Sequence, residues 1–532
     1  MPTLYLLGTG YLFILPWANA GLADDWSRDL CLFFSLFILA IFIFKDFRFI
    51  QSTFFSFLPL IAFICVFIIS FSNPSFKKFH PKILEEINYK SKLENCGSLA
   101  KANLVSNGIK LIANTSSKDP SKGLTIFLDF KNRYKDRFGA HNKDSLWNMI
   151  CVLEDKLKIP NLSMLPSLPV RNINNITKVY FLCFHVFLGF IFYKLILEDK
   201  SRLDKTCFLI FINTSILAIV GIIQKMYYVP NNNVLEILGI WDAPEPRYFF
   251  STFTYKNHWC TYALSSLFAG FLVCFKEFRS YNYDVIRSTK FIVCLLFSFP
   301  IFVSIPYAGS RSGSIILLSV VVYILIKFII GIERYKKNKF CLFFIFILFL
   351  IIPFVSLNFL KSNEFIEMRK NSISQIENAL NGKPPLRVSL WKDTVSQIRE
   401  KVWFGHGYDG YKTTNPAHQS YEVRFERSRG LENAHNPYIP LVAHAHSDFL
   451  EWICNYGIIG FFLFILPFLF HQLSIALFYE SISIKVLFVG SLIIYLMSMI
   501  DFPTRTPACL TILTVYIGMS FGYFRSNFEK RI

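Results

Sequence analysis

Two histidines and two carboxylates stand within eight residues of one another, directly before a long apolar run. They are His444, His446, Asp448 and Glu451. Histidine titrates near neutral pH and can accept a proton from an attacking hydroxyl group. Lipid penalises ionisable groups, so such a cluster at the start of a membrane helix is typical of a site for a polar or charged substrate. The segment therefore indicates chemistry at a membrane surface.

Isolated arginines stand in or beside the polar links between the apolar runs. Arg311 lies in a link barely long enough to turn the chain, and Arg387 opens an amphipathic segment. Arg247 and Arg505 lie in two other links, and Asn257, at the start of a run, is a further candidate for substrate binding or a helix cap. A guanidinium group is permanently charged and forked, so it binds phosphate oxygens in pairs. Several around one pocket would suit a pyrophosphate.

Several of these residues also fit simpler roles. Asp448, followed three residues later by Glu451, matches an N-terminal capping box. Arg505 could pair with Asp501, and Arg387 could be a solvated helix residue whose charge reaches the headgroups. No metal site is expected, because two histidines two residues apart without a clear third ligand form a poor zinc site.

The composition places these residues in a polytopic membrane protein. Of the 532 residues, 53% are hydrophobic and only 17% are charged. The apolar residues form runs of about 17 to 25 residues, the length at which a helix crosses a bilayer. We expect an all-α fold of about twelve spans, near residues 4–20, 29–44, 52–72, 177–198, 206–226, 258–275, 290–308, 312–330, 339–360, 448–471, 483–500 and 507–524.

The formal net charge of +19 is distributed as in a membrane protein and not as in a nucleic-acid-binding protein. Basic residues gather in every second link, which is the positive-inside pattern. This pattern places both termini in the cytoplasm and the candidate site on the outer face. We expect no nucleic-acid partner. The basic groups are Lys45 and Arg48; Lys200, Arg202 and Lys205; Lys276, Arg279, Arg287 and Lys290; Arg334, Lys336, Lys337 and Lys339; and Arg525, Lys530 and Arg531.

Five segments follow from this topology. They are N-terminal spans (1–72), an extracytoplasmic insert (73–176), central spans (177–360), a periplasmic helical loop (361–447) and C-terminal spans (448–532). The insert has apolar positions for a small, largely helical core, among them Ile109 and Trp147. Its Cys96 and Cys151 could form a disulfide in an oxidising compartment or remain free thiols.

The loop contains an amphipathic helix that ends near Gly405. We expect it to lie on the membrane surface or to cap a cavity. Beyond the loop, Gly457 and Gly460 are one turn apart and are expected to let a neighbouring helix approach closely. The apolar residues of the amphipathic helix, at spacings of three and four, are Val388, Trp391, Val395, Ile398 and Val402.

The order of these motifs resembles that of the O-antigen ligase and polysaccharide polymerase superfamily of bacterial inner-membrane proteins, over roughly residues 177–525. By this resemblance, Arg311 and Arg387 match the arginines that hold pyrophosphate, and His446 matches the essential histidine. The insert departs from the pattern of typical ligases. The motifs are Ser310-Arg311; Arg387 to Trp391; Gly405-His406-Gly407 with Tyr411; His444 to Glu451; Gly457 with Gly460; and Asp501-Phe502-Pro503 with Arg505 and Pro507.

The resemblance implies a C-type glycosyltransferase that moves a glycan from undecaprenyl pyrophosphate to an acceptor hydroxyl at the periplasmic face of the inner membrane. We expect inversion at the anomeric carbon, no metal and no other cofactor. The catalytic residues would be His446, Arg311 and Arg387, and the substrate-binding residues would be Arg247, Arg505, His444, Glu451 and Asn257.

The acceptor stays open among a lipid A-core (ligase), another lipid-linked glycan (polymerase) and a protein hydroxyl. A transporter for a lipid-linked anion is the alternative from another class. Transporters usually place polar groups or broken helices near the membrane midplane. Here the centres of the spans are almost free of ionisable residues, and His185, the main exception, is expected to be a satisfied buried residue.

Overall fold

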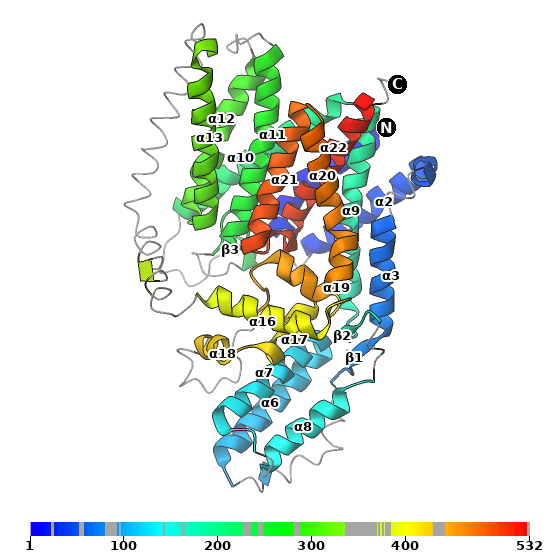
Figure 1. Ribbon diagram of the computed structural model, residues 1–532, viewed down its shortest axis with the longest axis vertical. Coiled ribbons are helices and arrows are strands. Elements are labelled where there is room, and N and C mark those ends of the chain that lie inside the picture. Colours follow the sequence, from blue (N-terminus) through cyan, green and yellow to red (C-terminus); the bar gives the residue numbers. More distant parts are fainter. Residues whose placement is uncertain are drawn as a thin grey trace. The chain divides into compact units, whose positions relative to one another are not determined.

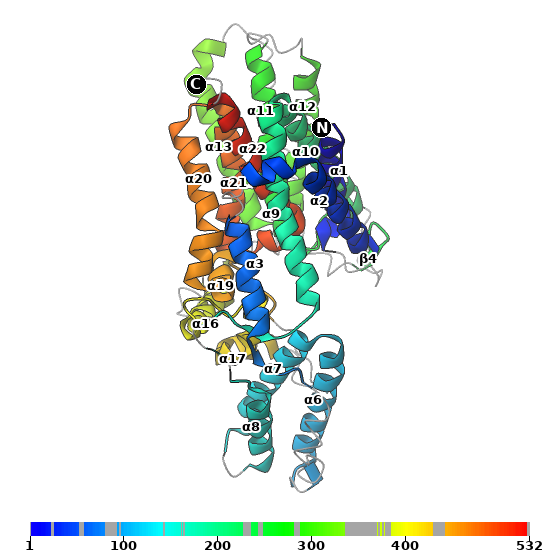
Figure 2. The ribbon, with the colours of Figure 1, turned by 90° about the vertical axis from the view of Figure 1, so that its right-hand side faces the viewer.

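The computed structural model confirms an all-α polytopic membrane protein (Figures 1 and 2). Within the described residues, eight helices are long and apolar enough to cross a membrane, and three shorter apolar helices lie at Thr3–Trp17, Leu58–Ser72 and Arg311–Tyr323. These helices coincide with the expected spans except 339–360, which lies outside the described residues. The structure describes residues 2–22, 26–52, 58–79, 93–94, 97–141, 144–160, 162, 165–226, 236–242, 248–280, 288–335, 370, 373–374, 377, 385–428 and 442–528.

The chain divides into two compact units, which we describe separately. Unit 1 comprises residues 1–52, 182–381 and 468–532, and unit 2 comprises residues 53–181 and 382–467. Two helices, α9 (Asn174–Glu198) and α20 (Leu466–Phe478), have residues in both units.

Unit 1 is a bundle of apolar helices around α11, whose spanning part is 78% buried. Contacts with α10, α12, α21 and α22 surround α11 (Figure 1). The elements of unit 1 are α1 (Pro2–Ile14), η1 (Leu15–Trp17), η2 (Asn19–Gly21), α2 (Trp26–Ser52), α10 (Ser201–Met226), β3 (Glu236–Ile237), β4 (Trp241–Asp242), α11 (Lys256–Ser280), α12 (Thr289–Tyr307), α13 (Arg311–Tyr335), α21 (Ile482–Ile500), η5 (Pro503–Arg505) and α22 (Pro507–Phe528).

Small residues and satisfied polar groups hold this bundle together. A Cβ on Gly518 of α22 would lie 1.9 Å from the carbonyl oxygen of Gly189 on α9, so only glycine allows these helices to pack so closely. His185 is 1% exposed, and its Nε2 lies 3.0 Å from the hydroxyl of Tyr11. This geometry agrees with the expected structural role of His185.

Unit 2 combines the insert with the described residues of the loop that precedes α19 and with α19 itself. The strands β1 and β2 pair in parallel, with Pro74 opposite Leu168. The elements of unit 2 are α3 (Leu58–Ser72), β1 (Pro74–Phe76), α6 (Leu99–Lys118), α7 (Pro120–Phe138), α8 (Ser145–Leu157), β2 (Leu168–Val170), α16 (Leu386–Glu400), α17 (Gly410–His418), α18 (Tyr421–Ser428) and α19 (Asp448–Phe464).

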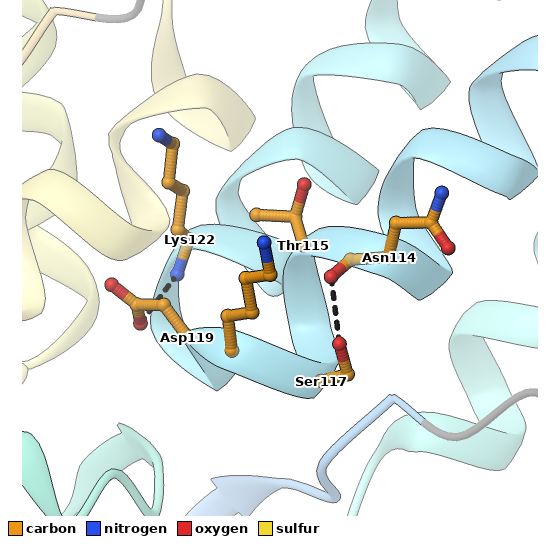
Figure 3. A pocket seen from close by; sticks show the side chains of 6 residues that line it. Asn114, Thr115, Ser117, Asp119 and Lys122 are labelled. Carbon is orange, nitrogen blue, oxygen red and sulfur yellow. Dashed lines mark hydrogen bonds between the residues drawn. The ribbon is translucent and has the colours of Figure 1, made fainter.

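The insert forms its own apolar core from α6, α7 and α8 (Figure 2). Ile109 and Trp147 belong to this core as expected, together with Phe127 and Leu153. The helices start at side-chain caps: Asp119 accepts the amides of Ser121 and Lys122, and Asp144 accepts those of Leu146 and Trp147. The sequence therefore encodes these helix starts locally. Figure 3 shows a polar pocket at the junction of α6 and α7, lined by Asn114, Thr115, Ser117, Lys118, Asp119 and Lys122.

The disulfide considered above is not present at Cys151, which is the one of its two cysteines that the structure describes. Cys151 lies half-buried on α8 and carries a free thiol. Cys96 lies outside the described residues. Packing on α8 instead leaves Cys151 beside the apolar core of the insert.

Candidate functional site

The candidate residues of unit 1 lie where α11, α13 and α22 begin. Asn257, 8% exposed, links two turns of the chain. Its Nδ2 donates to the carboxylate of Asp501, and its Oδ1 accepts from the hydroxyl of Ser310 at 2.7 Å. Ser310 also accepts the amide of Gly313 at 3.2 Å, which caps the first turn of α13. Asn257 thereby fixes the two turns that carry Arg311 and Arg505.

Arg311 is the first residue of α13 and is exposed, whereas Arg505 ends η5 and is half-buried. The carboxylate of Asp501 accepts from Asn257 and from the amide of Phe502 at 3.1 Å. The start of a helix carries a partial positive charge from its free amides, which favours anions. The turns therefore combine permanent cations with helix starts. The pairing of Arg505 with Asp501 stays a prediction.

An aromatic cluster fixes the start of α11 against η5. The ring centroids of His258 and Phe502 are 4.8 Å apart, and those of Tyr255 and His258 are 4.9 Å apart. His258 Nδ1 lies 2.6 Å from the hydroxyl of Thr506. These contacts give His258 a structural role: it packs against Phe502 and Tyr255 and holds the start of α11 against η5.

Lys256 is a cation that the sequence analysis did not select. A Cβ on Gly309 would lie 3.6 Å from Lys256 Nζ, so the ammonium group lies beside the turn that leads into Arg311. A signal was present in the sequence. Lys256 stands on an expected outer link, where the positive-inside pattern disfavours basic residues.

Three of the candidate residues of unit 2, His444, His446 and Glu451, lie at the start of α19. The helix is capped by Ser447 and not by Asp448, because the Ser447 hydroxyl accepts the Leu450 amide at 3.4 Å. The expected capping box of Asp448 and Glu451 is therefore wrong. Glu451, 1% exposed, instead accepts the amide of Ala445 at 3.2 Å, and its two carboxylate oxygens each lie 3.3 Å from His444 Nδ1. Glu451 fixes the segment that leads into the helix.

His446 has a strained backbone. Its φ of 51° lies in the left-handed region, which is uncommon for residues other than glycine. The indole Nε1 of Trp391 donates to the carbonyl of His446 at 3.4 Å. Strain of this kind persists where surrounding contacts impose it, and it often occurs at functional sites.

The buried face of α16 is largely polar, which corrects the expected apolar face. The buried residues are Leu390, Asp393, Thr394 and Gln397, whereas Val395 is 38% exposed. Gln397 donates to the carbonyl of Tyr411 at 3.2 Å. Burial raises the pKa of Asp393, although Asp393 accepts two hydrogen bonds from Ser420. Polar partners on the following helices therefore decide the orientation of α16. Arg387 lies exposed in its first turn.

Gly457 interrupts α19 instead of packing two helices together as expected. Its φ is 67° and its ψ is −179°, so the helix is broken there. The segment 402–407 enters the break: the amides of His406 and Gly407 donate to the carbonyls of Cys454 and Asn455 at 2.8 and 2.7 Å. The backbone groups freed by the break are thus satisfied within unit 2. At Gly460, an added Cβ would contact Tyr456 of the same helix.

His406 is a buried histidine that remains neutral. Burial lowers its pKa to about 4, and its Nε2 lies 2.8 Å from the carbonyl of Gln397. The neutral ring therefore donates from Nε2 to this carbonyl and fixes the turn of Gly405 to Gly407. His406 is a structural residue of the site.

The structure therefore brings the candidate residues together in two sets. Asn257, Arg311 and Arg505 belong to unit 1, and Arg387, His444, His446 and Glu451 belong to unit 2. Arg247 lies outside the described residues. That the two sets act on one pyrophosphate stays a prediction. Among the described residues, no group of three or more His, Cys, Asp and Glu side chains is arranged to hold a metal ion.

Comparison with known proteins matches one part of the chain to a family. Residues 295–465 match the family model described as O-Antigen ligase. The matched segment contains Arg311, Arg387, His444, His446 and Glu451, and it covers less than half of the 532 residues. No curated protein matches the chain.

Proposed function

We propose that the chain is a glycosyltransferase of polysaccharide biosynthesis, because residues 295–465 match the family model described as O-Antigen ligase. The donor would be a glycan on undecaprenyl pyrophosphate, and the acceptor would be a hydroxyl group. The site would face the periplasm from the inner membrane. The observation that carries the proposal is the link through Asn257, which fixes the cationic turns at the starts of α13 and α22.

The pyrophosphate would bind to the cationic turns. Arg311 and Arg387 would hold its oxygens, with Arg505, Arg247 and Lys256 as further cations. The charge on the pyrophosphate grows as the glycosidic bond breaks, and groups already in place stabilise it without rearrangement. Arg311 suits this role because Ser310 and Asn257 fix the start of its helix.

His446 would accept the proton of the acceptor hydroxyl. The acceptor oxygen forms a bond to the anomeric carbon, and the bond from that carbon to the pyrophosphate oxygen breaks. The proton goes to the His446 imidazole, and the polyprenyl pyrophosphate leaves with the bonding electrons. Attack from the face opposite the leaving group inverts the anomeric centre. No metal or cofactor enters this scheme. Glu451 and His444 would position the segment that carries His446.

Substitution of Arg311 or His446 tests the proposal. In a deletion strain that carries the Arg311→Ala or His446→Ala protein, we expect surface glycan to be lost while the protein inserts at normal levels. Matched controls are Arg399→Ala and His141→Ala, both at exposed positions outside the site. Near-normal surface glycan in both site variants would refute the assignment.

The deletion strain also separates the reactions within this class. A ligase deletion should accumulate lipid-linked polymer, a polymerase deletion should leave single repeats attached to the acceptor, and a protein-directed enzyme should leave a protein unglycosylated. Transport is the other candidate function. Vesicles that contain the chain and a lipid-linked glycan but no acceptor should show no movement of the glycan, whereas transbilayer movement would favour a transporter.

A further inference from the structure

The insert and the described loop residues 385–428 share an interface within unit 2 that is built from charged and polar groups. Helix α7 of the insert packs on α17 of the loop. The side chain of Asn132 on α7 donates to the carbonyl of Pro416 on α17. Two arginines of α18, Arg424 and Arg427, pair with two aspartates of α7, Asp136 and Asp129.

The two ion pairs differ in burial and geometry. Arg424 forms a forked pair with Asp136: Nε donates at 2.6 Å and Nη2 at 2.9 Å. Arg427 Nη1 lies 3.1 Å from Asp129 Oδ1, and both of these side chains are only 8% exposed. A forked arginine–carboxylate pair fixes direction as well as distance. The buried pair depends on both partners, because either charge alone would be left in a poorly solvated place.

The same arginines fix the residue that joins α17 to α18. Arg424 donates to the carbonyl of Gln419, and Arg427 donates to its side-chain oxygen. The next residue, Ser420, donates its amide and its hydroxyl to Asp393 of α16 at 3.0 and 3.1 Å. The contacts of the insert therefore continue through one peptide unit to the buried face of α16.

Helix α16 in turn contacts the strained histidine. Trp391, two residues before Asp393, donates to the carbonyl of His446. Lys401, directly after α16, donates to the hydroxyls of Ser75 and Ser167 at 3.1 and 2.6 Å, and both serines belong to the insert. The far end of α16 is thus attached to the insert as well.

We propose that the insert is an internal brace for the transfer site: Asp129 and Asp136 of α7 hold α18, and thereby keep α16 and His446 in the geometry that transfer needs. The two aspartates are positioning residues and do not contact the substrate. This inference rests on the proposed function for the role of His446, whereas the attachment of α18 to α7 can be tested without it.

Charge reversal in the full-length protein tests the brace. In Asp136→Arg the ion pair becomes a repulsion, and in the double variant Asp136→Arg with Arg424→Asp the pair is restored with opposite polarity. Asp155→Arg is the matched control, because Asp155 lies on α8 of the same insert with its side chain 74% exposed. Chymotrypsin reports on α18 through Tyr421 and Phe425, which are 59% and 45% exposed and are unchanged in all variants.

We expect Asp136→Arg to be cut faster at α18 and to transfer glycan about tenfold to about a hundredfold more slowly, since small displacements of catalytic groups have effects of this size. The double variant should recover part of both properties, because the ion pair is restored while the bond from Arg424 to the Gln419 carbonyl is lost. Asp155→Arg should behave as the parent. With lipid-linked glycan extracted from the deletion strain as donor, the loss should fall on kcat, with KM changed by less than about twofold. Asp129→Asn, which removes the buried charge without reversal, should act in the same direction.

Several outcomes would overturn the brace. They are unchanged cutting and transfer in Asp136→Arg, slower transfer without faster cutting, no recovery in the double variant, and an effect confined to KM. Because cutting needs no donor, it reports on the attachment of α18 even if the proposed reaction is wrong. If His446→Ala and Arg311→Ala keep activity while Asp136→Arg is cut faster, the proposed function fails and the attachment stands.

Discussion

At the scale of single residues, two of the histidines of unit 2, His406 and His446, illustrate how the environment of a side chain determines its role. His406 is 3% exposed and has a pKa of about 4, whereas His446 is half-buried on a strained backbone. The ordinary pKa of histidine is about 6.5. Between about pH 6.5 and about pH 4 the unfolded chain therefore binds more protons at this position than the folded chain, so stability falls as the pH falls through this window.

His406→Asn should reduce this acid sensitivity, because an amide can still donate to the Gln397 carbonyl but does not titrate. Between about pH 7.5 and about pH 5, we expect the parent to lose about 2 kcal/mol of stability through His406. The melting temperature of the purified protein, followed over this range, should fall less in His406→Asn than in the parent. His141→Asn, at an exposed position, is the control. Equal losses in all three proteins would contradict the burial of a neutral His406.

Ser310 is a second residue whose role depends on its partners. Its hydroxyl bonds Asn257 and caps α13, so Ser310→Ala should leave the Asn257 oxygen without this donor and loosen the start of the helix that carries Arg311. We expect a loss of about 1 to 2 kcal/mol in stability and a clear fall in glycan transfer, measured in the deletion strain. Ser319→Ala is the matched control, since Ser319 is exposed further along α13. Equal effects of the two substitutions would contradict the role of Ser310.

Sequence patterns predicted the structure where local chemistry decides. Apolar runs predicted the spans, because hydropathy and length are local properties, and the apolar positions Ile109 and Trp147 lie in the core of the insert as expected. The start of α19 shows the limit. Ser447 and Asp448 both suit a cap, and the choice between them depends on Glu451 bonding backward to Ala445. That contact follows from the folded path of the segment and not from the spacing.

At the scale of elements, the break in α19 is the feature that spacing alone could not predict. An apolar run with two glycines predicts a continuous helix with a close neighbour. The break exists because the segment 402–407 supplies donors and acceptors to the freed backbone: Ile458 and Ile459 donate to the carbonyls of Val402 and Trp403 at 2.9 and 3.1 Å. Polar partners also determine the orientation of α16. Gln397 donates to the carbonyl of Tyr411 on α17, and Asp393 accepts the amide of Ser420.

Gly457→Ala should disrupt this junction. The position has a positive φ, and an added Cβ would lie 2.1 Å from the carbonyl oxygen of Trp403. The backbone strain alone should cost about 1–3 kcal/mol, and the overlap adds to it. We expect a lower melting temperature and reduced transfer. Gly10→Ala is the control, because a Cβ there meets nothing within 4 Å. A Gly457→Ala protein as stable as Gly10→Ala would show that α19 is not broken at this residue.

At the scale of the whole molecule, the insert and the described loop form one unit although they are far apart in the chain. Asp129 and Arg427 are 298 residues apart, and Asp136 and Arg424 are 288 residues apart. Each of these residues alone resembles an ordinary solvated charge in an amphipathic helix. A single sequence contains no signal that pairs them, so the insert and the loop were predicted only as two separate segments of the chain.

The distribution of charge over the whole chain predicts the orientation in the membrane. Basic links are retained in the cytoplasm, whereas long segments cross largely regardless of their charge. Ser117, exposed at the end of α6, should therefore lie outside, and Lys205, exposed near the start of α10, should lie inside. A membrane-impermeant maleimide should label Ser117→Cys in intact spheroplasts and Lys205→Cys only after permeabilisation, each measured above the labelling of the parent cysteines. Labelling of Lys205→Cys in intact spheroplasts would show that the chain has the opposite orientation in the membrane. Protection of Ser117→Cys until permeabilisation would show the same. In that orientation the cationic turns would lie on the cytoplasmic side. A periplasmic transfer reaction would then be excluded.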